Sequence, residues 1–136
     1  MYLEFIADGH QDCPLLLISP AFPRKTKELS AAEELYLMLL NFATDYITLL
    51  EIHGLTIISP IDGCRLTAQV AEKDYGIVLL ENTKNHFTWK LTRQTWKEVL
   101  DYLFHFTRPN HEGQGHQWLN ETSDISVVIS TAPRRV

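Results

Sequence analysis

The chain contains few cysteines and no long apolar segment. Its 136 residues include two cysteines, Cys13 and Cys64, which are too few for a disulfide scaffold and would stay reduced in a cytosol. The longest apolar run, residues 35–40, spans six positions, whereas a membrane-spanning helix needs about 20. No basic segment precedes an apolar one at the start, so we expect no secretory signal. These absences predict a soluble, cytoplasmic protein with no membrane partner.

Positive charge is also scarce. Lysine and arginine number 12 against 17 acidic residues, which gives a net charge of −5. Nucleic-acid-binding proteins usually carry a basic face, because neutralising phosphates drives their affinity. Basic residues cluster here only at residues 24–27 and at Arg134–Arg135. We therefore expect no nucleic-acid partner, and a mildly acidic surface that would suit a basic partner.

Familiar catalytic and cofactor motifs are missing. The sequence has no Gly-x-Ser-x-Gly elbow and neither of the glycine-rich patterns that cradle nucleotide phosphates. His111 and His116 resemble the zinc motif His-Glu-x-x-His only superficially. They are five residues apart with two glycines between them, whereas two ligands on one helical face need a spacing of four. We expect no catalytic residue, metal or cofactor of the common kinds.

What the sequence does contain is the composition of an ordinary globular domain. It is 45% hydrophobic and 21% charged, which excludes a disordered tail or a collagen-like chain. A chain of this length can bury about two thirds of its unfolded surface, so it needs no disulfide or metal to fold. No linker, repeat or low-complexity segment divides residues 1–136, which are expected to form a single α+β domain.

The first helix signal is unusually apolar. A capping-box pattern at residues 30–33 marks a helix that begins as early as Thr26 and ends near Ala43. Its apolar positions occupy more than one face, so the helix is either covered on two sides or part of a subunit contact. The helix at residues 30–43 is therefore a candidate surface for a homodimer. Two strands are predicted before it, at residues 2–7 and 15–19.

Five strand signals follow one another between residues 47 and 91. The last alternates cleanly, with Phe87, Trp89 and Leu91 on its dry side. Cys64 directly precedes another alternating segment and is expected to be a buried thiol. Short turns between sequential strands predict antiparallel neighbours, and so a meander. The five segments are residues 47–52, 55–59, 65–71, 77–81 and 86–91.

The second helix has the strongest periodicity in the chain. Thr92 is the predicted N-cap, and apolar residues recur at helical spacing from Trp96 to Phe106. Extended segments at 116–120 and 125–130 follow a polar loop. The fold class expected is α+β: a mostly antiparallel twisted sheet of about six to eight strands with two helices packed on one face. Three polar side chains on the far side of the helix, at i, i+4 spacing, are interpreted as ordinary surface pairs: Lys97, Asp101 and His105.

The candidate binding residues lie around the loop after this helix: Arg108, His111, Glu112, His116 and Trp118. Tryptophan and arginine are typical hot-spot residues of protein interfaces. We favour Trp118 as an anchor for the loop, with a recognition aromatic as the alternative. A second polar loop at residues 8–14 would form one joint site with residues 107–118 if the two meet.

Three classes of function stay open. The first is a non-catalytic interaction or regulatory protein that binds another protein, for example an immunity-type inhibitor of a basic toxin. We expect this class because no complete catalytic motif is present. The second is a small hydrolase that uses the loop residues His10, Cys13 and His116, with or without a metal. The third is a small-ligand carrier with a pocket between helix and sheet.

Overall fold

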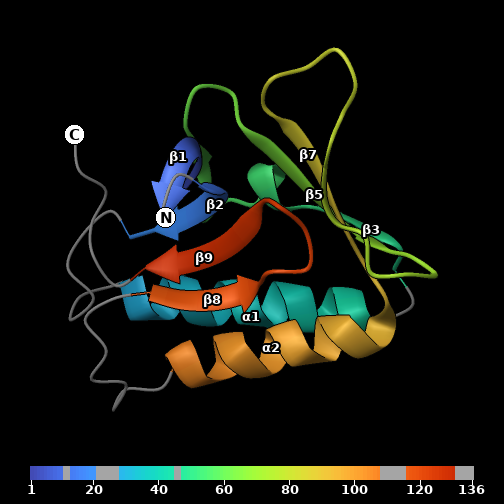
Figure 1. Ribbon diagram of the computed structural model, residues 1–136. Coiled ribbons are helices and arrows are strands. Elements are labelled where there is room, and N and C mark those ends of the chain that lie inside the picture. Colours follow the sequence, from blue (N-terminus) through green and yellow to red (C-terminus); the bar gives the residue numbers. More distant parts are fainter. Residues whose placement is uncertain (11–12, 21–27, 45–46, 108–115, 131–136) are drawn as a thin grey trace.

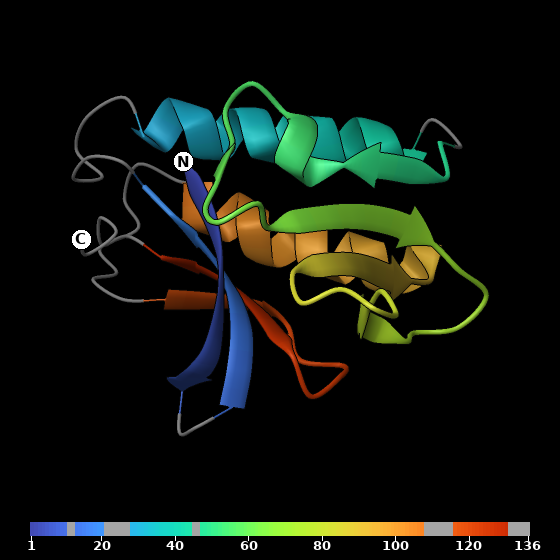
Figure 2. The ribbon, with the colours of Figure 1, turned by 90° about the horizontal axis from the view of Figure 1, so that it is seen from above.

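A computed structural model describes residues 1–10, 13–20, 28–44, 47–107 and 116–130 (Figure 1). These residues form two helices and two mixed β-sheets. Both sheets lie on the same side of the helix pair, and from above they stand side by side over it (Figure 2). The prediction of an α+β fold is confirmed. The prediction of one mostly antiparallel sheet is wrong, because the strands form two sheets and each contains parallel strands.

The first sheet has five strands in the order β4-β1-β2-β9-β8. β1 (Tyr2–His10) and β2 (Cys13–Ser19) form an antiparallel hairpin, and β8 (His116–Asn120) and β9 (Ser126–Ser130) form another. β2 and β9 run parallel and join the two hairpins. The short β4 (Ser59–Pro60) pairs with β1, also in parallel. The predicted strands at both ends of the chain are therefore confirmed, with their partners drawn from distant parts of the sequence.

The second sheet has four strands in the order β3-β5-β7-β6. They are β3 (Leu49–Glu51), β5 (Arg65–Val70), β6 (Gly76–Leu79) and β7 (His86–Leu91). The central pair, β5 and β7, is parallel, and both outer pairs are antiparallel. A 3-10 turn, η1 (Ile52–Gly54), ends β3 early.

The prediction of a meander between residues 47 and 91 is wrong. β6 and β7 do form a hairpin, but the connection at residues 71–75 carries the chain to the outer edge first, so β7 returns into the space beside β5. The segment 55–59 is not a strand of this sheet, because only Ser59 and Pro60 are extended and they pair with β1. Turn length predicts which strands form a hairpin, but not on which edge a hairpin is added.

The two helices pack antiparallel beneath the sheets (Figure 1). α1 (Glu28–Thr44) and α2 (Arg93–Thr107) have the expected bounds to within about two residues. The Arg93 guanidinium donates a 2.8 Å hydrogen bond to the Ala43 carbonyl, which places the start of α2 beside the end of α1. Neither helix in the described ranges is long and apolar enough to cross a membrane.

The core contains two fully buried tryptophans. The rings of Trp89 and Trp96 meet edge to face at 4.7 Å, and Phe42 of α1 packs on Trp96 at 5.1 Å. Each indole N–H has an acceptor: Asn120 Oδ1 at 3.2 Å for Trp89, and the Gln69 carbonyl at 3.1 Å for Trp96. Buried tryptophans usually need such a partner. The dry side of the strand at 86–91 is confirmed by the burial of its three predicted residues, Phe87, Trp89 and Leu91.

Candidate functional site

Most of the predicted site residues lie outside the described part of the chain. Arg108, His111 and Glu112 belong to the range 108–115, and only the backbone of His116 is described, as the first residue of β8. Whether residues 8–14 and 107–118 form one joint site lies outside the described residues too. Trp118 is described: it is half-buried on β8, opposite Val128 of β9.

Trp118 lines a groove of about 320 Å³ between α2 and the end of β8. We call it the acidic groove. Its first wall is α2, its second is residues 118–122, and one side chain comes from the connection between β5 and β6. Its lining includes three carboxylates and two aromatic side chains: Asp74, Glu98, Glu121, Tyr102 and Trp118.

Asp74 is fixed in the groove because it caps α2. One carboxylate oxygen accepts the Thr92 backbone N–H at 2.8 Å, and the other accepts the Thr95 hydroxyl at 2.6 Å. The Thr92 hydroxyl accepts the Thr95 backbone N–H at 3.2 Å, which confirms Thr92 as the N-cap. The hydrogen bond from Thr95, together with those from Thr92, holds the pKa of Asp74 below its usual value. Asp74 is therefore an anion held at the positive end of the helix dipole.

The opposite wall is anchored to the core through Asn120. Its side-chain oxygen accepts the Trp89 indole N–H, and its amide nitrogen donates to the Thr122 hydroxyl at 2.7 Å. A register shift separates Trp118 from Asn120, and such bulges re-aim side chains at the edge of a sheet. Leu119, inside the shift, is buried. The aromatic Trp118 and the carboxylate of Glu121 thus stand on a rim tied to the buried tryptophan cluster.

The turn between β8 and β9 is held against β6. The Ser123 hydroxyl accepts the Ile77 backbone N–H at 3.0 Å and donates to the Ile125 carbonyl at 3.1 Å. Gly76, at φ +75°, makes this approach feasible, because a Cβ there would lie 2.8 Å from the Ser123 side chain. The two sheets therefore meet at the groove end of the molecule.

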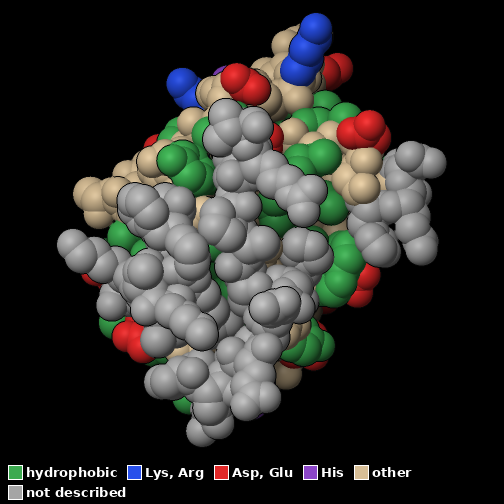
Figure 3. All heavy atoms as spheres, turned by 90° about the vertical axis from the view of Figure 1, so that its left-hand side faces the viewer, with side chains coloured by type: hydrophobic (Ala, Val, Ile, Leu, Met, Phe, Trp, Pro, Cys, Tyr) green, Lys and Arg blue, Asp and Glu red, His purple; other side chains and the backbone are tan. Residues whose placement is uncertain are grey.

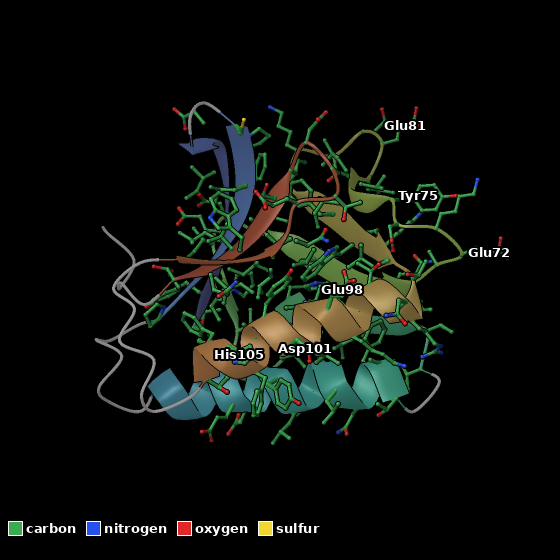
Figure 4. The ribbon with its side chains drawn as sticks, turned by 60° about the horizontal axis from the view of Figure 1, so that its bottom comes forward. Glu72, Tyr75, Glu81, Glu98, Asp101 and His105 are labelled. Atoms are coloured by element: carbon green, nitrogen blue, oxygen red, sulfur yellow. The ribbon has the colours of Figure 1, made fainter. Side chains whose placement is uncertain are left out.

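The groove combines negative charge with aromatic surface. Asp74, Glu98 and Glu121 line it, and none of its lining residues is Lys, Arg or His. Tyr102 is 47% exposed. Figure 4 shows Glu98 on α2 with Asp101 and His105 following along the same helix. Such a surface can attract a cationic side chain and hold it by ion pairs and by contact with aromatic faces.

Charge alone does not distinguish the groove. On the left-hand face of Figure 1, described Asp and Glu side chains occur from top to bottom, whereas described Lys and Arg side chains lie near the top (Figure 3). The molecule is thus acidic on more than one side. What marks the groove is a concave shape with two aromatic side chains among its carboxylates.

The two cysteines differ in burial. Cys13 is exposed, Cys64 is buried, and both are free thiols. Burial, reinforced by the charge of Glu4, raises the pKa of Cys64 to about 11, so it is protonated at neutral pH and a poor nucleophile. The prediction of a buried thiol at position 64 is confirmed. Within the described ranges, no three His, Cys, Asp or Glu side chains are placed to hold a metal ion.

Sequence reasoning named one groove residue, Trp118, and missed the others. Glu98 and Tyr102 flank the apolar stripe of α2, so their shared side could have been found from helical spacing. Asp74 gives no local signal, because its role depends on how the chain passes from β5 to β6.

Comparison of the chain with protein-family models, with curated proteins and with solved structures finds no match in any of the three. What the groove can bind is therefore inferred from the residues that line it.

Proposed function

We propose that this chain is a non-catalytic binding protein that takes a basic segment of a partner protein into the acidic groove. The observation that carries the proposal is the lining of the groove: three carboxylates and two aromatic side chains with no cation among them. A volume of about 320 Å³ lies at the lower end of ligand-binding pockets and suits one or two long side chains.

The physical basis is electrostatic and aromatic together. Neither Glu98 nor Glu121 forms an ion pair with a described residue, so both carboxylates are available to a ligand. Like charges gathered in one groove repel each other, and a bound guanidinium or ammonium group removes that repulsion. The faces of Tyr102 and Trp118 favour the same groups through cation–π contact, arginine more often than lysine.

An immunity-type inhibitor is one concrete form of this function. An acidic protein that blocks a basic partner gains association rate from the attraction between opposite charges, and that rate falls as salt is added. The free thiols Cys13 and Cys64 support the proposed cytoplasmic location.

The two alternatives receive less support from the groove. The hydrolase alternative needs a nucleophile with a base, and no Cys or His lines the groove. Its own residues His10 and His116 have side chains outside the described part. The ligand-carrier alternative shares the groove and differs only in the size of its ligand.

A second copy of the chain is a separate proposed partner, at a different surface. Leu37 and Met38 of α1 are 53% and 44% exposed, whereas Leu35, Leu39 and Phe42 of the same helix are buried. Because exposed apolar side chains of this kind mark interaction surfaces, the helix at residues 30–43 remains the proposed surface of a homodimer.

The groove is tested by an NMR titration of the whole chain with a short peptide of alternating arginine and glycine. We expect amide shifts to concentrate at residues 74, 95–102 and 118–122 and to weaken as salt is added. Glu98→Lys and Glu121→Lys should each weaken binding about tenfold, since each change replaces attraction by repulsion. A peptide with glutamine in place of arginine should not bind.

Glu72→Lys is the matched control, because Glu72 is an exposed acid outside the groove lining (Figure 4). It should change affinity by less than about twofold. Equal weakening by Glu72→Lys and Glu98→Lys, or shifts spread over the whole acidic surface, would contradict the proposal. Free arginine binding as tightly as the peptide would favour the small-ligand carrier instead.

A further inference from the structure

His53 lies where the chain leaves one sheet for the other. It belongs to η1, the turn that ends β3, and the chain after η1 leads to β4 of the five-stranded sheet. Along this connection the Ile57 carbonyl accepts a hydrogen bond from the Met1 amine at 2.8 Å. The His53 side chain is 16% exposed and lies outside the acidic groove.

The ring of His53 takes the place of a strand residue beside β5. Pairing between β3 and β5 ends at Glu51 and Thr67, because η1 turns the chain away at this point. Leu66, the neighbour of Thr67 in β5, meets the His53 side chain instead. Nδ1 of the ring lies 3.1 Å from the Leu66 backbone nitrogen and also 3.1 Å from the Leu66 carbonyl oxygen. Leu66 is fully buried, so the loss of either hydrogen bond carries a desolvation cost.

The two contacts require opposite states of the same ring nitrogen. In the neutral ring, Nδ1 accepts the Leu66 N–H only when the single ring proton is on Nε2. In the imidazolium form both nitrogens carry protons, so Nδ1 donates to the Leu66 carbonyl and no longer accepts the N–H. Nδ1 of His53 is therefore an acceptor in one protonation state and a donor in the other.

Glu51 faces the other ring nitrogen. Its carboxylate oxygen Oε2 lies 3.5 Å from Nε2, which is long for a hydrogen bond but close enough for strong attraction once the ring is charged. Among the described residues, Glu51 is the acid within ion-pair distance of this ring. The other titratable or charged groups of the neighbouring segments are Glu4, Asp62, Cys64 and Arg65.

We propose that His53 is a proton-dependent latch between η1 and β5. The neutral ring holds the Leu66 N–H. Protonation moves the hydrogen bond to the Leu66 carbonyl, converts the Glu51 contact into an ion pair and leaves the Leu66 N–H without an acceptor. The connection between the two sheets thus changes its attachment to β5 with pH. The latch is independent of the function proposed for the acidic groove.

NMR of the whole chain tests the latch, through the histidine ring nitrogens and the backbone amides between about pH 8.5 and about pH 5. At the upper limit, Nδ1 of His53 should resonate as an unprotonated acceptor and Nε2 as a protonated nitrogen. In acid the Leu66 amide proton should move upfield with the same midpoint as the His53 ring. The opposite neutral tautomer, or a Leu66 amide that does not follow the ring, overturns the proposal.

Three variants separate the latch from other effects of pH. His53→Asn offers a donor and an acceptor that do not titrate, so the Leu66 amide should lose its pH dependence. His86→Asn is the matched control, because His86 lies on β7 opposite Arg65, next to Leu66, and should leave the Leu66 titration unchanged.

Glu51→Gln shows which partner sets the tautomer of the neutral ring. It should leave the proton on Nε2, because the Leu66 N–H already occupies Nδ1. A ring that changes its tautomer in Glu51→Gln, or a Leu66 amide that still titrates in His53→Asn, overturns the role given to the contact between His53 and Leu66.

Discussion

The Trp89 indole N–H and the Asn120 side-chain oxygen form a 3.2 Å hydrogen bond that joins the two sheets. Trp89 belongs to β7 at the centre of one sheet, and Asn120 is the last residue of β8 at the edge of the other. The same Asn120 side chain holds Thr122 on the groove rim. Core packing and groove shape are therefore linked through a single amide group.

Asn120→Leu should destabilise the fold by about 1–3 kcal/mol, because it leaves the buried indole N–H of Trp89 without an acceptor. Asn120→Asp keeps an acceptor oxygen and should recover most of that loss. The measurement is the free energy of unfolding from urea titrations followed by tryptophan fluorescence. If the two variants are equally unstable, the hydrogen bond is not what holds this position.

Asp74→Asn should lower stability at neutral pH by about 1 kcal/mol or less, because Asp74 is exposed and its capping bonds are screened by water. The folded-state pKa of Asp74 is lowered, so its contribution is full above the unfolded value of 3.8. The contribution disappears as pH falls through the folded-state pKa. Urea titrations from about pH 7 to about pH 2 should show the two proteins converging in acid. A difference independent of pH would rule out the charge as the cause.

Cys13 should react with a thiol reagent in the native protein at neutral pH, whereas Cys64 should react only after denaturation. The pKa of Cys64 is raised from 9.0 to about 11, so folding favours the protonated thiol. Stability from this group is full below pH 9 and is lost as pH rises toward 11. Cys64→Ala should remove that part of the alkaline loss, while Cys13→Ser should leave it unchanged. Two fast thiols in the native protein would show that position 64 is open to solvent.

Gly76→Ala should destabilise the protein by about 1–3 kcal/mol, because the new Cβ meets Ser123 at 2.8 Å and the backbone has φ +75°. Gly54→Ala is the matched control: its nearest neighbour would be 3.7 Å away. Thermal unfolding by circular dichroism compares the two. A change in Gly54→Ala as large as in Gly76→Ala would contradict the close contact between β6 and the turn before β9.

The sequence predicts those elements whose signals are local. Thr92 and the spacing from Trp96 to Phe106 define α2, and the alternation at Phe87, Trp89 and Leu91 defines the buried face of β7. Pairing between strands is not local. Nothing near Leu66 indicates that its neighbour is Phe87, in a parallel strand, instead of a residue of the next strand along the chain.

The residues of the candidate site also differ in whether local sequence reveals them. Trp118 is predicted as a site residue because a tryptophan next to a polar loop is conspicuous in any sequence. Asp74 and Glu121 reach the same groove only because two distant connections converge at the start of α2 and the end of β8. From local sequence alone, Asp74 and Glu121 are each interpreted as a solvated turn residue.

The position of β9 between β2 and β8 has a consequence for biosynthesis. Leu15–Ile18 of β2 pair with Ser126–Ile129 of β9, so during synthesis the inner edge of the first hairpin has no neighbouring strand until Ser126–Ile129 have left the ribosome. During that interval an apolar strand with free backbone donors and acceptors is exposed to other nascent chains. Crowded expression at high temperature should therefore favour inclusion bodies, and slower translation in the cold should favour soluble protein.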